Sequence, residues 1–284
     1  MNFPNYFADA ESSFKESKFV IFGLPYDKTS SFRHGAAEAP KYIRQASWNF
    51  ETYNMLTGGD LTGIPIHDYG DLDISGMNPS DMVKTVKDFT AYILKNNKFP
   101  VAIGGEHSVT SGIIQAYPDD IAVVVLDAHM DFRDIYENEK FNHACVTKRI
   151  SDHLKIENIA LIGIRSAEKN EYNDAEEKKL FYKTSFEIRE KGMKKTLTEI
   201  DKHIGDKRTY LSFDIDALDP CYAPGTSTPE PFGISSFDGL EIIDFFSDRL
   251  VGFDIVEVCP HFDNGETSLI AAKYIRYLIE KSFI

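Results

Sequence analysis

Cysteine, tryptophan and long apolar runs are scarce in this 284-residue sequence. The cysteines, Cys145, Cys221 and Cys259, are odd in number and widely spaced, which predicts a reduced, cytoplasmic chain rather than a disulfide scaffold. The longest strongly apolar run, residues 121–126, is far shorter than the roughly 20 residues that a membrane span requires. The first residues, MNFPNYFADAESS, have neither the basic nor the apolar region of a secretory signal, so we expect none.

Positive charge is also in short supply. The chain has 31 Lys and Arg against 45 Asp and Glu, a formal charge of −14. A negative surface repels phosphate backbones, which argues against nucleic acid as a partner. It favours small cationic molecules through long-range attraction. Hydrophobic residues at 42% and charged residues at 27% are ordinary for a globular protein and exclude disorder, collagen and coiled coil as descriptions of the whole chain.

No repeat, Pro-rich linker or low-complexity tract divides the sequence, so we expect one domain over residues 1–284. Short runs rich in Val, Ile and Phe recur, and helical patterns lie between them. Such runs, with little alternation, are typical of strands buried on both faces of a parallel sheet. The pattern therefore predicts an α/β domain. The expected strands are 19–24, 99–104, 121–127, 159–164, 209–213 and 251–258, and the clearest expected helices are 80–96, 236–250 and 267–281.

Four of these expected strands end in carboxylates or imidazoles, which are the residue types that bind metals. In open α/β sheets, ligands bind at the carboxyl ends of the strands. One acidic strand end means little, because Asp often caps the helix that follows, but four together indicate a site. The four strand ends carry Glu106-His107, Asp127-Ala-His129-Met-Asp131, Asp214-Ile-Asp216 and Glu257.

The spacing of Asp127, His129 and Asp131 has a period of two, so an extended segment would aim all three at one face. Neighbours at i and i+2 would lie roughly 7 Å apart, which suits ligands of two ions about 3.5–4 Å apart. Asp127 and Asp131 would be roughly 13 Å apart if the strand continued. We therefore expect the strand to end near His129 and the chain to curl and bring Asp131 back.

His107 and the Asp214-x-Asp216 pair complete a set of four carboxylates and two imidazoles. Carboxylates with a minority of imidazoles favour Mn²⁺ or Mg²⁺, and the lack of thiolates argues against a structural zinc site. So many anionic ligands also favour two cations. A metal pair lowers the pKa of bound water from 15.7 to about 7, which makes hydrolysis the natural reaction class.

Several motifs resemble those of the ureohydrolase family, the arginases and agmatinases, and the resemblance covers nearly the whole chain. It implies a three-layer α/β/α fold with an eight-stranded parallel sheet, two Mn²⁺ per subunit, and a homotrimer or homohexamer. The segments near the N-terminus and at 223–231 are similar to the agmatinase branch. The motifs are Phe22-Gly-Leu-Pro-Tyr-Asp27, Arg33-His-Gly-Ala, Gly104-Gly-Glu-His-Ser, Asp127-Ala-His-Met-Asp-Phe-Arg133, Ser212-Phe-Asp-Ile-Asp-Ala-Leu-Asp-Pro220, Ala223-Pro-Gly-Thr-Ser-Thr-Pro-Glu-Pro231 and Glu257-Val-Cys-Pro260.

The resemblance also implies a role for each site residue. One metal would be held by His107, Asp127, Asp131 and Asp214, and the other by His129, Asp127, Asp214 and Asp216. Glu257 aligns with the carboxylate that pairs with the substrate guanidinium, a bidentate interaction that a planar cation allows. His143 aligns with the catalytic histidine, whose imidazole can pass a proton to the departing amine.

The implied activity is hydrolysis of agmatine to putrescine and urea, and the putrescine could enter polyamine biosynthesis or serve catabolism. The segment 132–142 has Asp134, Glu137 and Glu139 against Arg133 and Lys140. We expect these acids to form a cavity mouth that favours the free ammonium of agmatine over the carboxylate of arginine. Ser227 and Phe232 depart from the family pattern, where many members carry Gly, and leave the shape of the cavity wall open.

Other functions stay open at this point. The substrate could be guanidinobutyrate or arginine, or the chain could be an inactive ureohydrolase-like subunit that binds metal without turnover. A binuclear phosphoesterase also begins with D-x-H but typically adds G-N-H-[DE], which is absent here. A metal-dependent deacetylase shares the implied fold but usually binds one zinc with fewer carboxylates.

Overall fold

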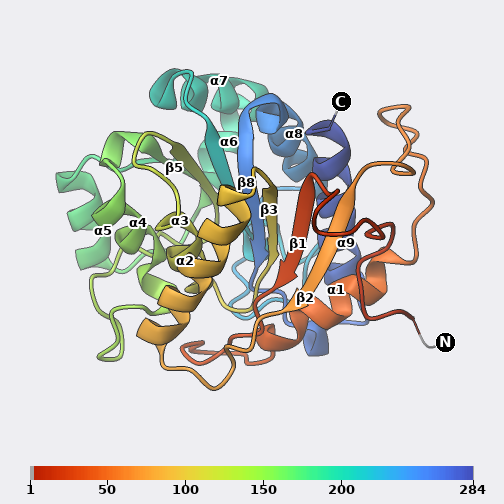
Figure 1. Ribbon diagram of the computed structural model, residues 1–284. Helices are drawn as coiled ribbons and strands as arrows, with labels where there is room; N and C mark the ends of the chain where they lie inside the picture. The colour runs from red at the N-terminus through yellow and green to blue at the C-terminus, as the bar shows by residue number, and fades with distance from the viewer. Residues whose placement is uncertain (1–2, 284) are drawn as a thin grey trace.

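The apolar runs form the centre of an eight-stranded parallel sheet in the computed structural model, which describes residues 3–283 (Figure 1). Met1, Asn2 and Ile284, which belong to the expected single domain, lie outside the described residues. The strand order is β2-β1-β3-β8-β7-β4-β5-β6. The strands are β1 (Phe19–Gly23), β2 (Ile66–Asp71), β3 (Phe99–Ile103), β4 (Ala122–Leu126), β5 (Ile159–Ile164), β6 (Phe181–Thr184), β7 (Thr209–Asp214) and β8 (Leu250–Val256).

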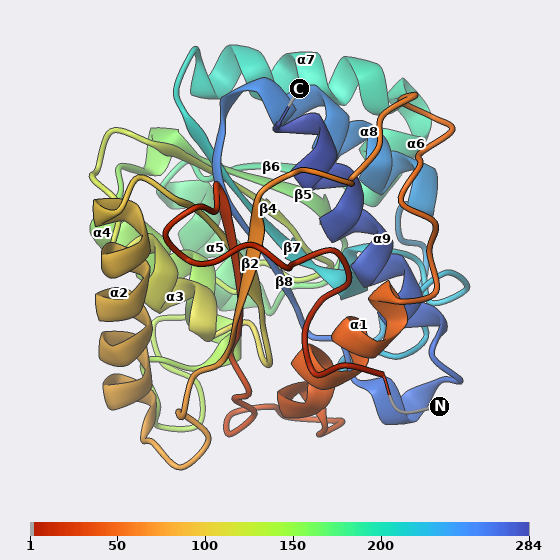
Figure 2. The same ribbon diagram turned by 45° about the vertical axis from the view of Figure 1, so that its right-hand side comes forward.

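Helices cover both faces of this sheet, so the expected α/β/α architecture is confirmed. In Figure 2, α2 and α3 stand on one side of the sheet, and α1 and α9 lie side by side on the other. Local signals fix several helix starts; for example, the Asn78 side chain accepts a hydrogen bond from the backbone N–H of Asp81 at the start of α2. The helices are α1 (Ala39–Ser47), α2 (Pro79–Lys95), α3 (Val109–Ile114), α4 (Val146–His153), α5 (Lys169–Glu177), α6 (Ser185–Lys191), α7 (Met193–Ile204), α8 (Ser236–Phe246) and α9 (Glu266–Lys281).

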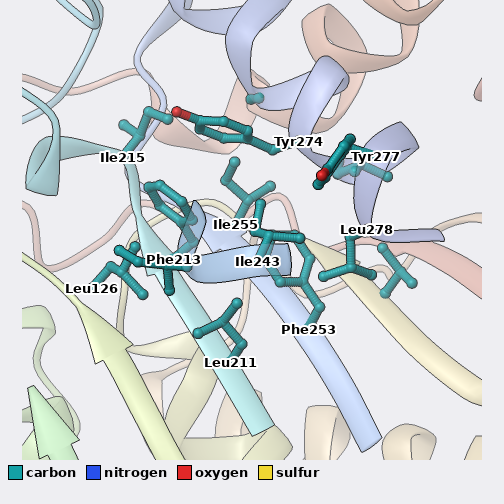
Figure 3. Close-up of a cluster of buried hydrophobic side chains, with 14 of the residues drawn as sticks. Leu126, Leu211, Phe213, Ile215, Ile243, Phe253, Ile255, Tyr274, Tyr277 and Leu278 are labelled. Carbon is teal, nitrogen blue, oxygen red and sulfur yellow. The ribbon is translucent and has the colours of Figure 1, made fainter. Parts of the chain in front are cut away.

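The core has two halves because successive side chains of a strand point to opposite faces. In β7, Leu211 and Phe213 pack beneath α8 and α9, with Tyr274 of α9 stacked on Phe213 (Figure 3). Tyr210 of the same strand points to the other half of the core, where it meets Tyr117. Burial on both faces explains why these strands show apolar runs without alternation.

The sequence pattern missed the two edge strands, β2 and β6. Their sequences, IHDYGD and FYKT, contain no apolar run because an edge strand is only partly buried. The helix expected at 236–250 is wrong at its end: α8 stops at Phe246, a short 3₁₀ turn follows, and β8 begins at Leu250. Within residues 3–283, no helix combines the length and apolarity needed to cross a membrane.

Candidate metal centre

Four neighbouring strands in the middle of the sheet, β3, β8, β7 and β4, deliver the predicted site residues at their carboxyl ends. His107 lies shortly after β3, and Asp127 directly follows β4. Asp214 is the last residue of β7, and Glu257 directly follows β8. The six expected metal ligands and Glu257 therefore meet at one sheet edge, although they are spread over some 150 residues of sequence, as the His107–Glu257 contact illustrates.

The Gly104-Gly105 pair lets the chain after β3 approach the segment that follows β1. A Cβ on Gly105 would lie 1.9 Å from the backbone oxygen of Tyr26, which no side chain could tolerate. The next residue, Glu106, donates its N–H to that same oxygen at 2.8 Å. This close crossing fixes the position from which the His107 side chain enters the site.

The carboxylates are oriented by short-range hydrogen bonds to backbone amides. Asp127 Oδ1 accepts from the N–H of His129 at 2.6 Å, and Asp214 Oδ1 accepts from the N–H of Asp216 at 2.9 Å. Such i to i+2 bonds are turns closed by the Asp side chain. The strand was expected to end near His129. β4 itself ends at Leu126, and an isolated parallel bridge joins His129 to Ser166, so the two-residue spacing reflects turns rather than a continuous strand.

In Asp127 and Asp214 the second oxygen, Oδ2, faces His107. His107 Nδ1 lies 3.1 Å from Asp127 Oδ2, 3.1 Å from Asp214 Oδ2 and 3.4 Å from Asp131 Oδ2. His129 Nδ1 lies 3.0 Å from Asp216 Oδ2 and 3.5 Å from Asp127 Oδ1. The chain curls at Asp131, whose φ of 48° is left-handed, and this curl turns its carboxylate towards His107.

The donor set fits two cations. His107, Asp127 and Asp214 form one group whose ligand atoms lie within 4.8 Å of one another, and Asp127, His129 and Asp216 form a second. Among the described residues, the buried His107 Nδ1 and Asp127 Oδ2 have no well-aligned hydrogen-bond partner. One proton on Nδ1 cannot satisfy three converging carboxylate oxygens, whereas a divalent ion can accept all four atoms as ligands.

The electrostatics of the buried carboxylates also favour bound cations. Burial, with the neighbouring charges of Asp216 and Asp127, raises the pKa of Asp214 well above its usual range. Burial, with the charge of Asp127, raises the pKa of Asp131 to about 7. Anions this close repel one another in a low-dielectric interior, so a pair of cations would stabilise their ionised forms.

A buried hydrogen-bond chain behind His107 orients its imidazole. His107 Nε2 lies 3.2 Å from Ser212 Oγ, and Ser212 Oγ donates to Asp254 Oδ1 at 2.7 Å. The hydroxyls of Tyr210 and Thr110 donate to the other Asp254 oxygen at 2.8 and 3.0 Å. This chain favours the tautomer with its proton on Nε2, which leaves the Nδ1 lone pair facing the centre. An aspartate inside the apolar run VGFDIV was the available sequence signal.

We expect Asp254→Asn to weaken metal binding by about 10- to 100-fold. An amide has one acceptor oxygen where the carboxylate has two, so Ser212 on one side and Tyr210 and Thr110 on the other could no longer all donate to residue 254. Competition with a fluorescent chelator measures this affinity directly. Tyr210→Phe is the matched control, since it removes one hydroxyl from Asp254 and keeps the link to Ser212. An unchanged affinity in Asp254→Asn would show that this chain does not tune the metal site.

A cavity of about 250 Å³ opens over the ligands, and His143 lies in its wall. His143 begins a 3₁₀ turn, and its backbone N–H donates to Thr29 Oγ1 at 2.9 Å. Its ring nitrogens lie 3.3 Å from Thr29 Oγ1 and 3.4 Å from Ser31 Oγ. Burial, with the nearby His129, lowers the pKa of His143 to about 4, so the imidazole is neutral at pH 7. Thr29 and Ser31 were missed from sequence, because only the fold brings them to residue 143.

Glu257 lines the same cavity and is almost completely buried. Its Oε1 accepts the backbone N–H of His107 at 2.6 Å, and its Oε2 accepts the hydroxyl of Ser227. Burial raises the pKa of Glu257 to about 8, against the opposing effect of these two donors. A bound cation would favour the ionised carboxylate.

The mouth of the cavity is acidic, but the expected loop acids do not form it. The segment 132–142 contributes Arg133 and Tyr136 to the lining within the described residues, whereas Asp134 pairs with Arg149 on α4. Apart from the metal-site residues and Glu257, the acidic lining comes from Glu168, Glu171 and Glu230, in segments that follow β5 and β7. Glu168 is exposed, Glu230 is half-buried and Glu171 is buried. Glu171 is partly neutralised by Arg133, whose Nε lies 3.5 Å from its Oε2.

Comparison with known proteins gives a consistent result. A sequence profile described as "Arginase family" matches residues 17–280. An agmatinase of Bacillus cereus is 34% identical over 282 residues, covering 96% of this chain and 94% of that protein. The N(1)-aminopropylagmatine ureohydrolase of Thermococcus kodakarensis is 34% identical, covering 93% and 91% of the two chains. The crystal structure of agmatine ureohydrolase from Thermoplasma volcanium is 39% identical, superposes with a TM-score of 0.95, and covers 100% of this chain and 96% of that one.

Proposed function

This chain belongs to the arginase family and is a ureohydrolase acting on C–N bonds, and we propose that it hydrolyses agmatine to putrescine and urea with two Mn²⁺ ions. The observation that carries this proposal is the convergence of two metal-binding groups, a neutral imidazole and a buried carboxylate on one cavity. The agmatinase relatives support the choice of agmatine.

We assign His107, Asp127, Asp131 and Asp214 to one ion, and His129, Asp127, Asp214 and Asp216 to the other. Four carboxylates, two imidazoles and no thiolate make a hard donor set, which supports manganese over zinc. When bound, the two metal ions would lower the pKa of water in the site, which is the chemistry that hydrolysis requires.

The role proposed for Glu257 is to hold the substrate guanidinium. Its carboxylate is fixed by the His107 amide and the Ser227 hydroxyl and lines the cavity beside Asp214. A fixed carboxylate can accept two parallel N–H bonds from a planar guanidinium, which orients the carbon that is attacked.

The role proposed for His143 is to move a proton to the nitrogen that leaves as amine. Because its pKa is lowered to about 4, the imidazole is neutral at pH 7 and must take up a proton before it can deliver one. Its contacts with Thr29 and Ser31 hold the ring at the cavity wall. A neutral imidazole suits this shuttle, since it can accept from water and then donate to the departing nitrogen.

The tail of the substrate would extend towards the acidic mouth. Glu168 and Glu230 lie there without a cation within ion-pair distance among the described residues. Unit charges about 8 Å apart at an effective dielectric of ~20 interact by about 2 kcal/mol, or about 30-fold. We therefore expect kcat/KM to be about 30-fold or more higher for agmatine than for arginine, whose carboxylate these acids would repel.

The test is urea release by the Mn²⁺-loaded protein from agmatine, N(1)-aminopropylagmatine, arginine and guanidinobutyrate, with a chelated control. Metal-dependent urea release chiefly from agmatine is the expected result. Preference for arginine would overturn the role of the acidic mouth. No urea from any guanidine would overturn the proposed activity and favour a subunit that binds metal without turnover.

A further inference from the structure

Two chain segments pair beside the cavity and place Ser227 opposite Glu257. The N–H of Cys259 donates to the Gly225 oxygen at 2.7 Å, and Thr226 pairs with Val258 in an antiparallel bridge. The backbone N–H of Ser227 donates to the backbone carbonyl oxygen of Glu257 at 3.4 Å. The register of this short ribbon therefore decides which side chain of the 223–231 segment meets the Glu257 carboxylate, and that side chain is Ser227.

The backbone of Glu257 has an unusual conformation that this ribbon maintains. Its φ of 63° is left-handed, which is unfavourable for a residue with a Cβ. Its N–H donates to the Gly105 oxygen at 2.8 Å, and its carbonyl accepts from Thr226 Oγ1 at 3.0 Å. Strained residues held by their surroundings cluster at functional sites, where they aim a side chain.

The Glu257 carboxylate is held from two sides by neutral donors. The His107 amide binds Oε1, and the Ser227 hydroxyl binds Oε2. A carboxylate offers about four acceptor positions. These two donors therefore occupy one acceptor position on each oxygen. The second acceptor position on each oxygen remains available to the cavity, which Glu257 and Ser227 line. Two parallel acceptor positions on one carboxylate are what a planar guanidinium requires.

We propose that Ser227 is a positioning residue that fixes the Glu257 carboxylate for bidentate guanidinium binding, a role that rests on the proposed function of the site. Ser227 is buried, and the bond to Glu257 is the one that its hydroxyl makes among the described residues. The Ser227 hydroxyl thus contacts the carboxylate to which the proposed function assigns the guanidinium.

The test compares Ser227→Ala with wild type in the Mn²⁺-loaded protein. Calorimetry measures the binding of n-butylguanidine, which has a guanidinium and no ammonium, and of putrescine, which has ammonium groups and no guanidinium. We expect Ser227→Ala to weaken butylguanidine binding about tenfold or more, because a hydrogen bond to a charged group is lost, and to leave putrescine binding unchanged. The KM for agmatine should rise by a similar factor with kcat nearly unchanged, since Glu257 binds ground and transition states alike.

Three further variants control this comparison. Ser227→Thr keeps a hydroxyl and should restore butylguanidine affinity to within about threefold of wild type. Ser227→Gly removes the hydroxyl independently and serves if the alanine variant does not fold. Ser185→Ala removes another buried hydroxyl, one without a hydrogen-bond partner in the described chain, and should change neither affinity.

Wild-type affinity for butylguanidine in both hydroxyl-free variants would overturn the proposal, as would an equal loss of putrescine binding. The proposed function fails separately, through absence of urea release by wild type. In that case the butylguanidine measurement still decides whether Ser227 positions Glu257.

Discussion

His143→Ala is expected to lower kcat for urea release by about 10²- to 10⁴-fold, the range in which a general acid–base group contributes. The neutral imidazole lies in the cavity wall but outside both metal-binding groups. Metal content, measured by elemental analysis, should therefore stay at the wild-type level, and the KM for agmatine should change little.

Free imidazole offers a sharper test of the same role. It should partly restore kcat in His143→Ala, because the truncated side chain leaves space beside Thr29 and Ser31. His34→Ala is the control, since this exposed histidine contacts Asp27 and does not line the cavity. Near wild-type kcat in His143→Ala would remove His143 from the reaction and leave the proton transfer to water.

Asp214→Asn should have opposite effects on activity and on the stability of the metal-free protein. Urea release should fall to the level of the chelated wild type, because Asp214 belongs to the metal-binding group of His107 and Asp127 and is assigned to both ions. The metal-free protein should become more stable by about 1 kcal/mol or more, equivalent to roughly 2–4 °C in Tm. Without metal, the Asp214 carboxyl must either stay ionised beside Asp127 and Asp216 or take up a proton, as its raised pKa indicates, and an amide incurs neither cost.

Thermal unfolding with and without Mn²⁺ measures both parts of this prediction. Wild type should gain stability on adding metal, and Asp214→Asn should gain much less. Asp134→Asn, which alters an exposed carboxylate paired with Arg149, should respond to metal as wild type does. A metal-free Asp214→Asn less stable than metal-free wild type would show that repulsion among the carboxylates does not limit stability.

The position of the site could be predicted from sequence because parallel strands all end at one edge. Asp127 and Asp214 each directly follow a run of buried apolar residues. The position of each carboxylate is therefore determined mainly by the strand that the run forms. The two-residue spacing of Asp127, His129 and Asp131 was nevertheless attributed to an extended strand. The side chain of Asp127 bonds the amide of His129, so the spacing marks a turn beyond the strand, and the same residues converge by a different geometry.

The cavity mouth could not be predicted, because loops far apart in sequence form it. Asp134 was expected in the mouth, but it pairs with Arg149 on the helix that follows. Glu230 reaches the cavity because Arg165 holds its backbone carbonyl at 2.7 Å, a contact across 65 residues. The local sequence pattern predicts neither the position of Asp134 nor that of Glu230. An acidic residue in a loop has the same sequence signature whether its side chain faces the cavity or a neighbouring helix.

The strand order also decides when the site can form during synthesis of the chain. β8, the last strand to leave the ribosome, lies between β3 and β7 in the finished sheet. A nascent chain that ends before Leu250 therefore lacks the strand that joins the His107 side of the centre to the Asp214 side. Such non-local pairings form late, because the long loop between them must close first. Metal capture should accordingly follow completion of the chain, and C-terminal truncations that remove β8 should abolish metal retention even though all six ligands remain.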